Sequence, residues 1–64
     1  MRKYRKYIVF YDDGHDFGEL VFYSDYRANS RNNLWDARKA LIKAYGEKRG
    51  WNLRITNTQR DIRD

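Results

Sequence analysis

Tyr7-Ile8-Val9-Phe10-Tyr11 is the stretch of sequence that decides the fold. Every residue in it is β-branched or aromatic, and apolar side chains occupy both of the alternating positions. Neighbouring side chains of a strand point to opposite faces of a sheet, so a segment that is apolar at every position is buried on both faces. The stretch therefore predicts the central strand of a sheet.

The residues after this stretch predict a hairpin. Residues 12–18 are rich in Asp and Gly and indicate a loop, with the tight turn at Asp13-Gly14. Glu19-Leu20-Val21-Phe22-Tyr23 is again rich in residues that favour strands. We therefore expect a second strand that pairs antiparallel with the first.

One amphipathic helix is predicted in the middle of the chain. Asn33 can cap its first turn, and Ser30 is an alternative cap one turn earlier. Gly46 stands where a residue of positive φ would end the helix. The apolar residues of the predicted helix recur at helical spacing and form one face: Leu34, Ala37, Leu41, Ala44 and Tyr45.

A third strand is predicted after the helix. Residues 51–56 alternate between apolar and polar, with Trp51, Leu53 and Ile55 on the inner side. From Asn57 onward the alternation fades, so we expect the tail, residues 57–64, to fray.

Together these elements predict an α+β fold of ββαβ type, with one helix packed on one face of a three-stranded sheet. The segment that is apolar on both faces belongs in the middle, which gives the strand order 2-1-3. Residues 1–64 form a single small domain with a basic N-terminal arm, residues 1–6.

Composition narrows the class of protein. The chain has no cysteine, a net charge of +5 and no apolar run near the roughly 18 residues of a membrane span. These features predict a cytoplasmic protein without disulfides and without a membrane partner. We expect no metal and no cofactor, because the chain has no zinc-ligand cluster, P-loop or GxGxxG motif.

One helix can cover only one face of the sheet, so the other face is the candidate binding surface. Alternation assigns Ile8, Phe10, Leu20, Phe22, Trp51, Leu53 and Ile55 to the helix side. It assigns Tyr7, Val9, Tyr11, Val21, Tyr23, Asn52 and Arg54 to the uncovered side.

A tyrosine-rich face beside a basic arm favours nucleic-acid binding, either to DNA or to RNA. Bases would stack on Tyr7, Tyr11 and Tyr23. The cations at the margin would neutralise phosphates: Lys3, Arg5, Lys6 and Arg54. We prefer this hypothesis because the aromatic face and the basic arm then share one explanation.

Two alternatives use the same face. It can be a protein interface, either of a homodimer or of a small regulator or inhibitor of another protein, because interface centres are rich in Tyr and poor in charge. In the other alternative the tail, Trp35 or the arm folds over the face and nothing binds there.

A second basic surface is expected on the helix and its flanks. Its residues are Arg27, Arg31, Arg38, Lys39, Lys43, Lys48 and Arg49. Trp35 and Ile42 lie at the edge of the apolar arc, where we expect them to cover the rim of the core.

His15 is the only histidine and supports one enzymatic hypothesis, a small His15-dependent RNase. The neighbouring acids, Asp12, Asp13 and Asp16, would repel RNA, and a histidine in an exposed loop needs no function. We therefore expect a protein that is not an enzyme.

Overall fold

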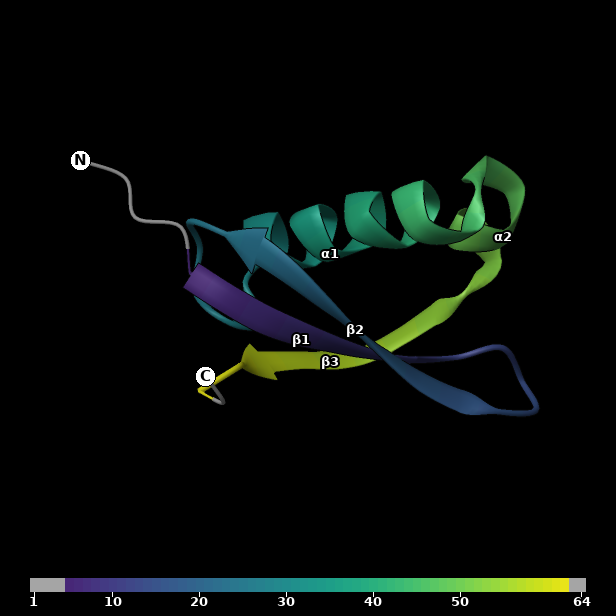
Figure 1. The fold of residues 1–64 in the computed structure, drawn as a ribbon, viewed down its shortest axis with the longest axis horizontal. Coiled ribbons are helices and arrows are strands. Elements are labelled where there is room, and N and C mark those ends of the chain that lie inside the picture. Colours follow the sequence, from purple (N-terminus) through teal and green to yellow (C-terminus); the bar gives the residue numbers. More distant parts are fainter. Residues whose placement is uncertain (1–4, 63–64) are drawn as a thin grey trace.

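Three strands and two helices make up the part of the chain that the computed structural model describes, residues 5–62 (Figure 1). In chain order they are β1 (Arg5–Asp12), β2 (Phe17–Ser24), α1 (Arg31–Tyr45), α2 (Glu47–Asn52) and β3 (Arg54–Arg60). Arg5 and Lys6 begin β1 instead of belonging to a separate arm.

The strands form one sheet in the order β2-β1-β3, with β1 antiparallel to both neighbours. The predicted α+β class and the central position of the first strand are confirmed. A register shift between Phe10 and Tyr11 makes one irregularity in the pairing of β1 with β3.

Helix α1 begins at the alternative cap. The Ser30 side chain accepts a hydrogen bond from the Asn33 backbone N–H, so the first turn starts before Asn33. Gly46 ends the helix as predicted: it adopts φ 94° and ψ 161°, a conformation essentially restricted to glycine, and its N–H donates to the Ile42 carbonyl.

Helix α2 was not predicted. Trp51 was expected in the third strand but lies in α2, which packs against α1 where Gly50 meets Ile42. A Cβ on Gly50 would lie 2.4 Å from the Ile42 Cα, so only glycine permits this approach. The alternation from Trp51 to Ile55 was misleading because so short a run does not distinguish a strand from a helical turn that precedes one.

The tail is ordered further than expected. Strand β3 continues to Arg60, and beyond it the Asp61 N–H donates to the Lys6 carbonyl over 2.9 Å. Thr58 is buried and bonded to two asparagines, Asn29 and Asn33. The prediction of fraying from Asn57 was wrong because polar hydrogen bonds hold this strand where an apolar pattern is lacking.

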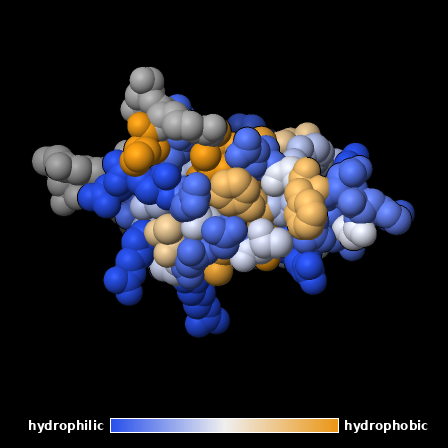
Figure 2. Space-filling model, turned by 90° about the horizontal axis from the view of Figure 1, so that it is seen from below, coloured by the Kyte–Doolittle hydropathy of each residue, from blue (hydrophilic) through white to orange (hydrophobic). Residues whose placement is uncertain are grey.

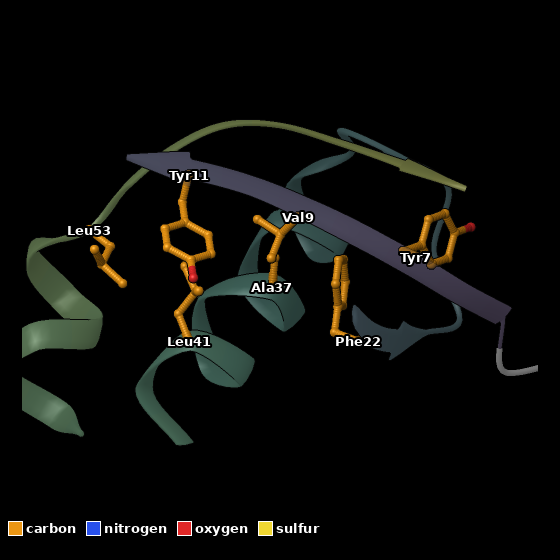
Figure 3. Close-up of a cluster of buried hydrophobic side chains, with 7 residues drawn as sticks. All are labelled: Tyr7, Val9, Tyr11, Phe22, Ala37, Leu41 and Leu53. Carbon is orange, nitrogen blue, oxygen red and sulfur yellow. The ribbon is translucent and has the colours of Figure 1, made fainter. Parts of the chain in front are cut away.

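The core lies between the sheet and α1, and it contains the side of β1 that was predicted to face away from the helix (Figure 3). Tyr7 and Tyr11 are 2% and 9% exposed. Tyr11 points toward Leu41 of α1 (Figure 3), and the Tyr7 ring stacks on Phe22 with the centroids 5.7 Å apart. The core cluster consists of Tyr7, Val9, Tyr11, Phe22, Ala37, Leu41 and Leu53.

The assignment of faces along β1 was therefore wrong by one residue. Ile8 and Phe10, predicted inward, lie on the uncovered face with their β2 partners Val21 and Glu19, although Ile8 is itself only 4% exposed. Both faces of β1 are apolar, so hydropathy alone could not choose between them. The choice follows from the register, in which Tyr7 pairs with Phe22 and Tyr11 with Gly18. Gly18 has no side chain, and the Tyr11 ring occupies the space that its Cβ would need.

Candidate functional site

The uncovered face of the sheet carries fewer tyrosines and more paired charges than predicted. Figure 2 shows it as a band of apolar side chains set among hydrophilic ones. Val21 and Tyr23 of β2 are 41% and 61% exposed there, and Phe17 is 86% exposed.

Cations on this face are already paired with acids. Arg54 lies 3.2 Å from Asp12, and Lys6 lies 3.7 Å from Asp61. Of the predicted stacking residues only Tyr23 lies on this face, since Tyr7 and Tyr11 are buried in the core. Arg5 is exposed at the start of β1, and Lys3 falls outside the described residues. The predicted tyrosine platform is therefore not assembled.

A groove of about 620 Å³ lies on the other side of the molecule, beside α1. A volume of this size is typical of ligand sites in proteins. Helices α1 and α2, strand β3 and the segment before α1 contribute its lining: Asn29, Arg31, Asn32, Leu34, Trp35, Arg38, Trp51, Ile55 and Thr56.

Two tryptophans dominate the groove. Trp35 of α1 and Trp51 of α2 are 51% and 49% exposed, and their ring centroids are 5.7 Å apart with an interplanar angle of 48°. Large aromatic rings are normally mostly buried in a folded domain, so a half-exposed pair is unusual. Trp35 therefore lines the groove and does not fold over the uncovered sheet face.

Arg38 of α1 connects the helices that line the groove. Its guanidinium Nη1 donates to the carbonyls of Gly50 and Leu53, each over 2.6 Å, and so ties the end of α2 to α1. The guanidinium carbon also lies 5.9 Å from the centroid of the Trp51 ring. Trp51 is thus positioned by Arg38 and by the close approach of Gly50 to Ile42.

The electrostatic character of the groove is positive. Arg31 and Arg38 line it, and its lining includes no Asp or Glu. Within residues 5–62, Arg31 forms no ion pair, so its exposed side chain can meet an anion. Asn32 is exposed and adds an amide that can both donate and accept hydrogen bonds.

The second basic surface is divided by the fold. Arg31 and Arg38 lie in the groove, whereas Lys39 pairs with Asp36 at 3.5 Å. Lys48 and Arg49 line a separate hollow of about 470 Å³ at the start of α2, where Arg49 lies over the Tyr45 ring. Arg27 and Lys43 are exposed and line neither.

Trp51 is the functional candidate that sequence reasoning missed, because it was assigned to an inner strand face. One signal could have found it. Residues 27–54 carry eight basic residues against two acids, and both tryptophans of the chain fall within this segment.

His15 lies in the exposed β1–β2 loop. The Asp13 carboxylate accepts hydrogen bonds from the backbone N–H groups of Asp16 and His15, which lower the pKa of Asp13. The hollow around His15 has a volume of about 160 Å³ and contains one cation, Arg54, which already pairs with Asp12. The loop is thus organised by its own acids.

Two further results concern residues 5–62. No group of His, Cys, Asp or Glu side chains in this part of the chain is arranged to hold a metal ion. Neither described helix has the length and apolar character required to cross a membrane.

Comparisons with protein-family models, with curated proteins and with solved structures found no match to this chain.

Proposed function

We propose that the protein binds single-stranded nucleic acid in the groove between α1, α2 and β3. The observation that carries the proposal is the half-exposed Trp35–Trp51 pair beside Arg31, in a groove lined by no acidic residue. Aromatic faces combined with unpaired cations are the chemistry that binds single strands, whose bases are free to stack on protein rings.

The geometry of the pair decides how a base would stack. A base inserted between two rings needs about 7 Å, twice the ~3.4 Å spacing of stacked bases. The two indole centroids are only 5.7 Å apart and the rings are tilted. A base therefore stacks on the outer, exposed face of an indole, with its phosphate toward Arg31. In this proposal Asn32, which also lines the groove, hydrogen-bonds the edge of the base.

The proposal keeps the function preferred from the sequence and moves it to a different surface. Either DNA or RNA fits it, and the protein acts by binding and not as an enzyme. A cytoplasmic location stays a prediction of the sequence.

Fluorescence anisotropy with labelled single- and double-stranded oligonucleotides tests the proposal. We expect tighter binding to single strands, together with quenching of tryptophan emission. Loss of one stacking contact costs about 1–3 kcal/mol, so Trp35→Ala should weaken binding roughly 5- to 150-fold. Arg31→Gln should also weaken binding, and the loss of affinity should be larger at low salt concentration than at high salt concentration.

Lys43→Gln is the matched control, because it removes an exposed cation of α1 that does not line the groove. Circular dichroism verifies that each variant is folded. The proposal fails if the wild-type protein shows no binding below about 100 µM at low salt, an affinity that even non-specific binders reach. Equal affinity of Trp35→Ala and wild type would also reject it.

A further inference from the structure

Strand β2 lies at one edge of the sheet, and half of its backbone groups point away from β1. The Asp61 N–H donates to the Lys6 carbonyl, so the even-numbered residues of β1 bond toward β3 and the odd-numbered ones toward β2. In the β1–β2 register, the odd-numbered residues of β1 pair with even-numbered residues of β2. The outward groups of β2 therefore belong to Phe17, Glu19, Val21 and Tyr23.

The opposite edge of the sheet is protected. On β3 the outward Thr58 N–H donates to the Asn29 side chain over 2.8 Å, and the register shift near Phe10 interrupts the regular pairing. Arg54 and Arg60 add charge to that strand. Natural sheets block edge pairing with such devices: covering segments, bulges and charged side chains.

Strand β2 has none of these protections among the described residues. Its pairing with β1 is regular over eight residues, and its sequence contains no Pro, Lys or Arg and a single charge, Glu19. Beyond its ladder with β1, no hydrogen bond within residues 5–62 reaches the outward groups of Glu19, Val21 or Tyr23. Three of its side chains, Phe17, Val21 and Tyr23, are exposed apolar groups.

We infer that the β2 edge pairs antiparallel with the β2 edge of a second copy of this chain, joining the two sheets into one. A two-fold axis beside Val21 places Val21 opposite its own copy. In that register Glu19 of one copy lies opposite Tyr23 of the other, where the carboxylate can accept a hydrogen bond from the tyrosine hydroxyl. The partner strand supplies the donors and acceptors that the edge lacks.

The charges at the two ends of β2 favour an antiparallel second copy of the chain as the strand that pairs with this edge. The Phe17 end adjoins the acidic loop that contains Asp13 and Asp16. The Ser24 end adjoins two cations, Arg5, its partner on β1, and Arg27, and one acid, Asp25, so this end keeps a net positive charge. Antiparallel pairing brings the acidic end of each copy toward the basic end of the other. By the two-fold symmetry this favourable charge contact forms at both ends of the paired strands.

The mass in solution tests the inference, measured by light scattering over a range of concentrations. We expect wild type to reach about twice the 7.9 kDa of one chain. Val21→Lys introduces an edge charge at an exposed position and should raise the dimer dissociation constant at least tenfold. Gln59→Lys on β3 adds the same charge to the uncovered face away from the β2 edge, and should leave the dimer unchanged.

A crosslinking test locates the contact. Because the chain contains no cysteine, a single Val21→Cys exchange provides one thiol, which in the proposed register lies beside its own copy. Mild oxidation should convert this variant into a covalent dimer, whereas Gln59→Cys should form no covalent dimer on a denaturing gel. The inference is overturned if wild type is a monomer at millimolar concentration, if Val21→Lys has the same dimer dissociation constant as wild type, or if both cysteine variants crosslink equally.

Discussion

At the scale of single residues, Asn33 joins three segments that are distant in the sequence. It is fully buried in the first turn of α1. Its Nδ2 donates to the Tyr26 carbonyl over 2.9 Å, and its Oδ1 accepts from the Thr58 hydroxyl over 2.7 Å. These bonds attach the start of the helix both to the segment after β2 and to β3. A buried amide is tolerated here because its hydrogen bonds are satisfied.

Replacing this amide should therefore be costly. Asn33→Ala leaves the Tyr26 carbonyl without its partner and takes the 2.7 Å acceptor from the Thr58 hydroxyl, which keeps only its bonds with Asn29. Loss of a buried hydrogen-bond partner costs about 1–3 kcal/mol. We expect urea denaturation to show a loss of roughly 2–4 kcal/mol in the free energy of unfolding. Asn32→Ala, at the exposed neighbouring position, is the control and should stay within about 0.5 kcal/mol. Similar losses in both variants would contradict this role of Asn33.

Tyr11 provides a prediction about pH. Burial, together with the hydrogen bond to the Tyr45 hydroxyl, raises the pKa of Tyr11 from 10.0 to about 12. The folded state thus favours the neutral phenol. Its contribution to stability is complete below pH 10, the unfolded value, and is lost as pH rises toward 12. Thermal unfolding of wild type should show this loss, and Tyr11→Phe should show a smaller decline over the same range.

Tyr23→Phe serves as the control for that experiment, because Tyr23 is exposed and lies on the opposite face. Its unfolding temperature should fall with pH as steeply as that of wild type. If Tyr11→Phe and Tyr23→Phe decline equally, Tyr11 is not the group responsible.

At the scale of secondary-structure elements, the short helix α2 determines the groove. It contributes Trp51 and is attached to α1 by the Gly50–Ile42 contact and by Arg38. Six residues make too short a helix to be stable alone, so α2 depends on these tertiary contacts. Its position is therefore sensitive to a change at one residue.

Gly50→Ala tests this dependence. The added Cβ would collide with the backbone of Ile42, so α2 must move away from α1 and separate Trp51 from Trp35. We expect red-shifted tryptophan emission, a stability loss of about 1–3 kcal/mol typical of overpacking, and weaker nucleic-acid binding. Lys48→Ala, an exposed site in the same helix, should change none of these. Unchanged emission in Gly50→Ala would show that the contact does not position Trp51.

At the scale of the whole molecule, the two proposed surfaces lie on opposite sides of β1. The groove includes Ile55 and Thr56 of β3, whereas the dimer contact uses the outer edge of β2. A dimer joined through β2 consequently leaves both grooves open, so that one assembly presents two binding sites for a strand.

Salt concentration should affect the two kinds of contact differently: nucleic-acid binding should depend on it and dimerisation should not. Binding to single strands weakens with a slope of about −0.7 per neutralised phosphate in a double-logarithmic plot. Two or three phosphates near Arg31 and Arg38 predict a slope of roughly −1.4 to −2.1. The dimer should persist over the same range, because backbone hydrogen bonds and apolar contacts dominate it. A salt-independent affinity for oligonucleotides would contradict phosphate binding in the groove.

The candidate site was only partly predictable, as three residues illustrate. Tyr23 was placed correctly on the uncovered face because Leu20 and Phe22 of β2 were correctly assigned inward, and alternation then turns Tyr23 outward. Tyr11 was misplaced because both faces of β1 are apolar. Trp51 was misplaced because its neighbours alternate like a strand, while the contacts that make them helical involve Arg38 and Ile42, which are distant in the chain.

The sequence by itself determined the α+β class, the central position of β1, the end of α1 at Gly46 and the predominance of basic residues, since these follow from local hydropathy, backbone preference and charge. Only the tertiary structure decided which side of β1 enters the core, how far β3 extends and which side chains form the groove. Those outcomes depend on register and on contacts between distant segments, which local sequence patterns do not encode.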